Sequence, residues 1–341
     1  MYNRLISFVG KHSILSTAQY GFRKQHSTQH AIIDIVDKIY KNLDNKEFTC
    51  GIFIDLKKAF DTVDNNILLS KLYHYGIRGL VYDWFASYLS SRFQTTAISN
   101  NISNKEKCLC GVPQGSVLGP LLFVLYINYI CVSSSKFNFY LFADDTSILY
   151  SHKNVRVLEQ IVNSELQNVC HWLEANKLTL NIQKSNFVIF HTKQKALRFV
   201  PNIKIIDVTT KTMIPLEMKD TFKYLGLLID FNLTWKSHVD YISPKISRLV
   251  NIIARLRHYV PKYTLQKIYH GLIYPYLTYG ISIWGQANKT ILNPLLILQK
   301  RVIRLLNYAN YRDHAILSLL TPKYYRLIFF TFIILHVLCM I

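Results

Sequence analysis

The chain is poor in acidic residues. Its 341 residues include 20 Asp and Glu against 40 Lys and Arg, a formal net charge of +20. It is not poor in apolar residues, which make up 50% of the chain and exclude a disordered or low-complexity protein. So large a positive excess indicates a polyanionic partner, either nucleic acid or an anionic membrane surface.

Cysteine clusters and long apolar runs are also scarce. Of the six cysteines only Cys108 and Cys110 lie close together, and no second pair or histidine cluster completes a zinc site, so we expect a reduced compartment. The first 13 residues lack the apolar run of a signal peptide. Residues 327–341 are almost wholly apolar, but 15 residues fall short of the roughly 20 that span a bilayer. A buried helix is expected there, not a membrane anchor.

The positive charge is unevenly distributed. Residues 241–341 contain 13 basic residues and one acid, Asp313, whereas residues 1–240 contain 27 basic and 19 acidic residues. In the basic region Ile246, Val250 and Ile253 recur at helical spacing. The pattern predicts a mixed α+β body followed by a mostly helical basic region.

Hydrophobic periodicity predicts the elements of the body. Helices are expected over 29–43, 65–75, 80–89, 121–130 and 155–178. Strands are expected over 50–56, in a hairpin formed by 93–99 and 105–112, in two halves of 138–150, and in short segments between 179 and 231.

Three acids stand where acids are costly. Asp55 ends an apolar strand, and Asp144 and Asp145 separate two apolar strands. Three carboxylates brought together repel one another unless cations neutralise them, and magnesium prefers such oxygen ligands. Two ions about 4 Å apart could activate a hydroxyl and stabilise a leaving pyrophosphate. The alternative for Asp144 and Asp145 is an ordinary turn, although hairpin turns favour Asn-Gly or Asp-Gly.

Five motifs in order resemble the reverse transcriptases of non-LTR (LINE-type) retrotransposons, in particular the jockey-like group. They are FIDLKKAFDTVDNNILLSKL (53–72), GVPQGSVLGPLLFVLYIN (111–128), LFADDTSILY (141–150), LNIQKSNFVIF (180–190) and YLGLLID (224–230). The flanking segments QYGFRKQHSTQHA (19–31), LIYPYLTYGISIWG (272–285) and LQKRVIRLL (298–306) are also similar to that family. Any one motif could arise by chance, but five in order are specific.

The resemblance implies a role for particular residues. Asp55, Asp144 and Asp145 would bind magnesium and carry catalysis, with the Leu56 carbonyl as a further metal ligand. Nucleotide binding would fall to Phe60, as a steric gate against a 2′-hydroxyl, and to Gln114, Gly115 and Lys184. The primer grip would be Tyr224, Leu225 and Gly226. Nucleic-acid contacts would come from Arg23, Lys245, Arg248, Arg255, Arg257, Lys300, Arg301 and Arg304.

For several of these residues a plainer interpretation stays open. Phe60 could be a core aromatic, Gln114 a loop amide, and Lys184 and Arg23 solvated surface residues. A charge stripe is usually a solvated helix face, but a stripe of one sign with almost no acids favours a nucleic-acid surface.

The fold implied is α+β: a right-hand polymerase palm with an antiparallel sheet packed on helices, partial fingers and a helical basic thumb. Residues 1–48 would be a partial fingers segment, 49–235 the palm with inserted finger elements and the primer grip, and 236–341 the thumb and C-terminal extension. The implied activity is RNA-directed DNA polymerisation with two Mg²⁺, or Mn²⁺ as a substitute. RNA template, DNA primer and deoxynucleoside triphosphates would be the partners, with no membrane involved and a nuclear location.

The sequence also departs from the family pattern. An Arg-containing finger motif expected before residue 19 and an N-terminal endonuclease are missing, and Asn128 is followed by Tyr129 where Asp is usual. These departures suggest an N-terminally truncated copy. A nucleic-acid-binding remnant without catalysis is therefore the alternative function, and a membrane-surface protein is a more distant one.

Overall fold

The computed structural model describes residues 1–90, 92–207 and 210–309. The chain divides into two compact units, Met1–Lys219 and Asp220–Ile341. The first mixes helices and strands and the second is mostly helical, as the sequence predicts. No helix within these ranges is long and apolar enough to cross a membrane. The apolar run 327–341 lies outside the described residues.

A five-stranded sheet forms the centre of the first unit. Its strand order is β11-β8-β1-β7-β6, with β1 antiparallel to both β7 and β8, and β11 parallel to β8. The strands are β1 (Phe48–Ile54), β6 (Asn138–Phe142), β7 (Asp145–His152), β8 (Asn186–Phe190) and β11 (Glu217–Met218). The expected palm-like antiparallel sheet is therefore present.

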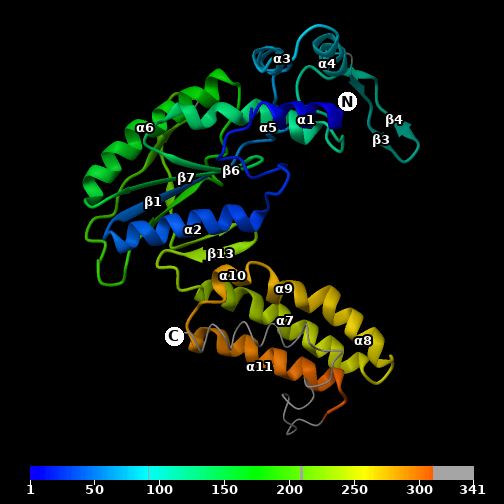
Figure 1. Ribbon diagram of the computed structural model, residues 1–341, viewed down its shortest axis with the longest axis vertical. Coiled ribbons are helices and arrows are strands. Elements are labelled where there is room, and N and C mark those ends of the chain that lie inside the picture. The colour runs from blue at the N-terminus through cyan, green and yellow to red at the C-terminus, as the bar shows by residue number, and fades with distance from the viewer. Residues whose placement is uncertain (91, 208–209, 310–341) are drawn as a thin grey trace. The chain divides into compact units, whose positions relative to one another are not determined.

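Helices lie on both faces of this sheet. In Figure 1, α2 (Thr28–Asp44) lies on one side of the strands and α6 (Val155–Ala175) on the other. Cys50, Ile52 and Ile54 join the apolar core that includes α6, whereas the alternate residue Thr49 accepts a hydrogen bond from the Asn42 side chain of α2 at 3.2 Å. Because both faces of β1 are covered, its sequence is a nearly continuous apolar run.

The remaining elements of the first unit surround the sheet. The helices are α1 (Tyr2–Lys11), α3 (Asn65–His74), α4 (Leu80–Ser90) and α5 (Gly119–Ile127), which continues as a 3₁₀-helix over Asn128–Ser133. The predicted hairpin is observed as two short ladders, β2 (Phe93–Gln94) with β5 (Glu106–Lys107) and β3 (Ala97–Ile98) with β4 (Asn101–Ile102). A further pair joins β9 (Lys204–Ile206) to β10 (Met213–Pro215).

The second unit combines one hairpin with a helical bundle. The hairpin pairs β12 (Thr221–Tyr224) with β13 (Leu227–Asp230). The helices are α7 (Lys236–Leu256), α8 (Lys262–Ile268), a π-helical turn (Tyr269–Ile273), α9 (Tyr274–Thr278), α10 (Ile281–Trp284) and α11 (Lys289–Leu306). Because β13 packs on α7, the hairpin groups with the helices of the second unit. The predicted boundary between palm and thumb at 235/236 stays a prediction.

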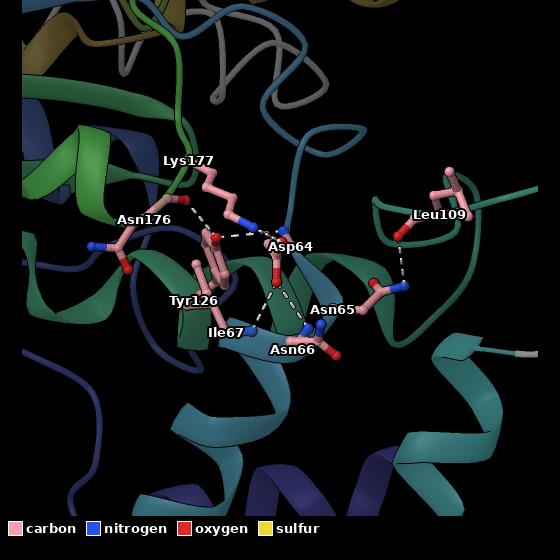
Figure 2. Close-up of polar contacts among 8 residues, drawn as sticks. All are labelled: Asp64, Asn65, Asn66, Ile67, Leu109, Tyr126, Asn176 and Lys177. Atoms are coloured by element: carbon pink, nitrogen blue, oxygen red, sulfur yellow. Dashed lines mark hydrogen bonds and ion pairs between the residues drawn. The ribbon is translucent and has the colours of Figure 1, made fainter. Parts of the chain in front are cut away.

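A polar junction ties α3 to α5 and to the C-terminal end of α6 (Figure 2). The Asp64 carboxylate caps α3 by accepting from the backbone N–H groups of Asn66 and Ile67, both at 3.0 Å, and pairs with the Lys177 ammonium at 2.6 Å. The Tyr126 hydroxyl donates to the Asn176 carbonyl at 2.5 Å. Partial burial opposes ionisation of Asp64, but the ion pair and the two cap hydrogen bonds prevail and lower its pKa.

Replacing Asp64 should therefore loosen this junction. Asp64→Ala removes the N-cap and the ion pair and is expected to lower the free energy of unfolding by about 1–2 kcal/mol. Asp64→Asn keeps a capping oxygen and should lose less than half of that. Urea unfolding at pH 7 measures both values. Equal losses in the two variants would contradict a capping role.

Candidate active site

The three carboxylates predicted to bind metal lie at adjoining strand ends. Ile54 of β1 pairs with Thr146 of β7, so the next position of the same register brings Asp55 level with Asp145. Residues opposite each other on an antiparallel pair project from the same face, with Cβ atoms about 5 Å apart. Phe142 pairs with Asp145, which leaves Asp144 in the two-residue turn between β6 and β7. The predicted hairpin around this pair of acids is confirmed.

The turn itself has an unusual backbone. Ala143, its first loop residue, has φ of 56°, a conformation that glycine adopts far more readily. A non-glycine residue held there stores backbone strain, which persists only where the surroundings fix it. A positive φ at this position is what a two-residue hairpin turn requires, so the backbone leaves the choice between a simple turn and a metal site open.

A second turn is fastened to Asp55. The Asn181 side chain donates to Asp55 Oδ2 at 2.8 Å, and its backbone N–H donates to the Asp55 carbonyl at 2.8 Å. The Ser185 hydroxyl accepts from the Asp55 N–H at 3.1 Å. Lys184 lies exposed in this same turn. Asn181 and Ser185 were missed by sequence reasoning, although both lie within the 180–190 motif.

The Leu56 carbonyl is directed away from the neighbouring segment. Leu56 forms an antiparallel bridge with Leu180, and its two hydrogen bonds use the Asp55 carbonyl and the Lys57 N–H, at 2.8 Å each. In such a pair the backbone groups of the bridged residue point to the opposite side. The Leu56 carbonyl is therefore not used by this bridge, and its role as a metal ligand stays a prediction.

The carboxylates of the acidic group repel one another. The pKa of Asp145 is raised to about 6. The largest cause is loss of hydration, and the negative charges of Asp144 and Asp55 add to it. Solvent reaches the Asp145 side chain, but the surrounding protein still removes part of its hydration. An all-carboxylate set whose members repel one another suits a hard divalent cation. No three His, Cys, Asp or Glu side chains within the described ranges already stand in position to hold a metal ion.

The 111–128 motif begins beside Phe60. The backbone N–H of Val112 donates to the Phe60 carbonyl at 2.9 Å, and the Gln114 side chain donates to the Asp61 carboxylate at 2.8 Å. The partly buried Phe60 ring lies 4.5 Å from the ring of the fully buried Phe123. Phe60 thus borders both the core and the surface.

Gln114 is an exposed residue at the rim of a large pocket. The pocket, of about 970 Å³, lies between the 58–61 turn and the 108–114 loop, with Lys58 and Arg92 contributing positive charge. Phe60, Gly115 and Lys184 are not among its lining residues. Gly115 has φ of 77°, which explains a glycine there, and a side chain at this position would meet no protein atom within 4 Å.

The predicted primer-grip residues form the tight turn of the β12–β13 hairpin. Tyr224 pairs with Leu227, and the loop residues Leu225 and Gly226 have φ of 43° and 94°, as a type I′ turn requires. The Tyr279 hydroxyl donates to the Leu225 carbonyl, and its ring lies so close that a Cβ on Gly226 would approach it to 3.1 Å. The chain therefore holds this turn from the α9–α10 segment.

A basic and aromatic pocket of about 290 Å³ adjoins that turn within the second unit. The Lys245 and Lys223 ammonium groups lie 3.6 and 5.9 Å from the centre of the Tyr241 ring. A hydrogen bond with Lys245, and the charges of both lysines, lower the pKa of Tyr241. Two cations sharing one wall favour an anionic ligand.

The predicted nucleic-acid residues fall into two groups. Residues 241–309 carry ten Lys and Arg and no acid. The predicted residues among them occupy two helices that pack on each other, α7 and α11. They are Lys245, Arg248 and Arg255 on α7, Arg257 at its C-cap, and Lys300, Arg301 and Arg304 on α11. Arg23 belongs to the first unit, where its guanidinium donates to the Ser16 carbonyl at 3.2 Å and lines a separate pocket of about 450 Å³.

The raised pKa of Asp145 makes stability depend on pH. Because the folded protein binds this proton more tightly than the unfolded chain, the carboxyl favours folding below pH 4, and that contribution is lost as the pH rises through about 6. Without divalent ions at pH 7.5, Asp145→Asn should raise Tm by about 2 °C, and at pH 4 it should not. Mg²⁺ should raise Tm of the wild type more than that of the variant.

The matched control is Asp37→Asn on the exposed side of α2, which should leave this pH dependence unchanged. Thermal unfolding in EDTA over pH 4–8 measures it. A lower Tm for Asp145→Asn at pH 7.5 would refute the repulsion.

Comparison with known proteins places this geometry in a family. Residues 1–229 match the family described as reverse transcriptase (RNA-dependent DNA polymerase), whose members use divalent metal ions. The chain is 29% identical over 318 residues to the probable RNA-directed DNA polymerase from transposon BS of Drosophila melanogaster, covering 89% of this chain and 34% of that protein. It is 27% identical over 314 residues to the RNA-directed DNA polymerase from mobile element jockey of the same species, covering 89% and 33%.

The chain thus spans about a third of the length of these relatives. A solved structure of telomerase from Candida albicans in complex with a fragment of telomeric RNA shares the fold, with a TM-score of 0.50 at 12% identity over 94% of this chain and 58% of that one. The expected resemblance to jockey-like elements is confirmed. By its match over residues 1–229, the chain belongs to the reverse transcriptase family.

Proposed function

We propose that the chain is the polymerase part of an RNA-directed DNA polymerase of a non-LTR retrotransposon. It would copy an RNA template into DNA from a 3′-hydroxyl primer. The observation that carries the proposal is the register of β1 and β7, which sets Asp55 level with Asp145 and beside Asp144 within the matched segment. This is an arrangement of carboxylates that serves phosphoryl transfer.

Two Mg²⁺ ions, or Mn²⁺ in their place, would be held by Asp55, Asp144, Asp145 and the Leu56 carbonyl. When bound, such ions lower the pKa of a primer hydroxyl and neutralise charge on the phosphates. Asn181 fixes one oxygen of Asp55 and leaves the other for a cation. The role of the polypeptide in this proposal is to keep the metal-binding oxygens together at one edge of the sheet.

Deoxynucleoside triphosphates would bind near the 111–115 loop. Gln114 borders the large pocket beside Asp61, and Phe60 is joined to the same loop through Val112. Lys184, exposed in the turn fastened to Asp55, would supply positive charge to the triphosphate. Gly115 would allow the loop to adopt a positive φ, which a residue with a side chain adopts only with strain.

The second unit would hold the primer and template. The turn Tyr224–Gly226 would act as the primer grip, and the basic residues of α7 and α11 would contact the phosphates of an RNA–DNA duplex. Arg23 would contribute a further phosphate contact from the first unit. The nuclear location implied by the resemblance stays a prediction.

The central test removes one proposed ligand. Asp144→Asn should reduce dTTP incorporation on poly(rA)/oligo(dT) with Mg²⁺ by at least about 10³-fold, because a neutral amide cannot replace a metal-binding carboxylate. Binding of the same duplex, measured by fluorescence anisotropy, should persist and weaken steeply with salt. Asp37→Asn serves as the charge-matched control and should incorporate normally.

Undiminished incorporation by Asp144→Asn would overturn the assignment. Salt-sensitive duplex binding by a wild-type chain that incorporates nothing would instead identify the nucleic-acid-binding remnant. The observation behind this alternative is the strongly basic helices, which could bind a duplex without a working catalytic site.

Phe60 can be tested separately as a gate or a core residue. Phe60→Ala should lower the preference for dTTP over UTP by about 10- to 100-fold, since removing the ring makes room for a 2′-hydroxyl. Phe60→Tyr keeps the ring and should keep the preference. If Phe60→Ala only lowers Tm, with the preference unchanged, the ring is a core aromatic packed on Phe123 and not a gate.

A further inference from the structure

A buried glutamine contacts the turn that bears Asp144. Gln19 is completely buried, and its Oε1 accepts two backbone hydrogen bonds, from Gly21 N–H at 2.8 Å and from Ala143 N–H at 3.3 Å. Because both donors are N–H groups, the amide oxygen must face them. Ala143 precedes Asp144 directly, so this contact reaches the backbone next to a proposed metal ligand.

The segment around Gln19 also extends the sheet. Gln19 forms a parallel bridge with Leu141, whose N–H donates to the Ala18 carbonyl and whose carbonyl accepts from the Tyr20 N–H, both at 2.8 Å. The segment thus lies along the free edge of β6, immediately before the turn. This pairing fixes the position of Gln19 along β6, two residues before Ala143.

Gly21 completes the contact through its lack of a side chain. A Cβ built on Gly21 would lie 2.4 Å from the Ala143 nitrogen and 3.0 Å from the Phe142 carbonyl carbon. No real Cβ approaches backbone atoms so closely, so a glycine is required for the segment to rest against the turn. Close backbone approach, and not a positive φ, explains this residue.

The Gln19 oxygen makes all the hydrogen bonds of that side chain. Its Nε2 has no partner among the described residues, which is costly for a buried donor. Its partner in the contact, Ala143, has a strained positive φ that its surroundings must hold. The contact from Gln19 to the Ala143 N–H provides such a restraint from outside the hairpin.

We propose that Gln19 is a positioning residue that, with Gly21, holds the Ala143–Asp144 turn in the conformation needed for catalysis. The proposal rests on the proposed function, since it assumes that Asp144 and Asp145 are catalytic. Gln19 acts through the backbone of Ala143 and touches neither substrate nor the reacting atoms.

The test uses Gln19→Met in the full chain, which keeps the side-chain volume but removes the acceptor. Hydrogen–deuterium exchange of a peptide covering 141–146 should become at least about tenfold faster, with β1 unchanged. The kcat for dTTP should fall by about 10- to 100-fold while the Kd for primer–template is unchanged, since small misplacements of reacting groups are costly. Gln19→Glu retains an acceptor oxygen and should keep the 141–146 protection.

A matched control is available in the second unit. Gln299 of α11 is the other buried glutamine of the described chain, with 3% exposure, so Gln299→Met measures the effect of losing a buried amide elsewhere. It should not change exchange over 141–146. Gly21→Ala provides a second route, because its Cβ must displace the turn, and should reproduce both effects of Gln19→Met.

Two results would overturn the proposal: unchanged exchange over 141–146 in both Gln19→Met and Gly21→Ala, or faster exchange throughout the sheet, which would mark a general structural role. If the wild-type chain incorporates no nucleotide, the proposed function fails and the exchange experiment alone decides. Local opening at 141–146 would then still support the contact as a restraint on this turn.

Discussion

Mutual repulsion of carboxylates at one edge of the sheet is the constraint on which the rest of the first unit depends. The register of β1 and β7 sets Asp55 and Asp145 level, and the tight turn adds Asp144. The pKa of Asp145 is raised first by its loss of hydration and then by the charges of Asp144 and Asp55. A protein maintains such a group only if the surrounding structure resists the tendency of the charges to move apart.

Two segments distant in sequence, together with the buried core around β1, provide this resistance. The 181–185 turn binds both the backbone and the side chain of Asp55. The 18–21 segment lies along β6 and contacts the Ala143 N–H. Below them both faces of β1 are buried, so the strand that carries Asp55 cannot shift without disturbing the core. Asp145 is exposed, Asp55 and Asp144 are partly buried, and hydrogen bonds hold the backbone around them.

Much of this arrangement could be predicted from sequence, because it follows from periodicity. Apolar strands that end in acids predicted the Asp55 and Asp144–Asp145 strand ends, and the 3.6-residue spacing predicted α2, α6 and α7. The hairpin over 93–112 was predicted with strands over 93–99 and 105–112, whereas each observed strand there has two residues. Its paired residues are exposed on both faces, so no core extends the ladders beyond two residues.

Gln19, Asn181 and Ser185 could not be predicted in the same way. Each acts through one hydrogen bond to a backbone or carboxylate 124 to 130 positions away, and such contacts leave no periodic trace in the sequence. The only signal was their place inside motifs in which the resemblance assigned roles to other residues, Arg23 and Lys184. Amides and hydroxyls that hold the backbone through a distant contact cannot be told from ordinary loop residues in a single sequence.

The uneven charge of the chain can be explained by the same electrostatic repulsion between negative groups. Carboxylates concentrated on a sheet edge would repel a phosphate backbone unless cations intervene, and metal ions supply only local compensation. Under the proposed function, long-range attraction would come from elsewhere in the chain, and residues 241–309 carry ten basic side chains and no acid. Helices α7 and α11 pack on each other, and both are amphipathic, with their apolar residues buried and basic residues on the remaining faces. Under the proposed function, this separation along the sequence would let basic side chains hold a nucleic acid while the acids hold metal ions.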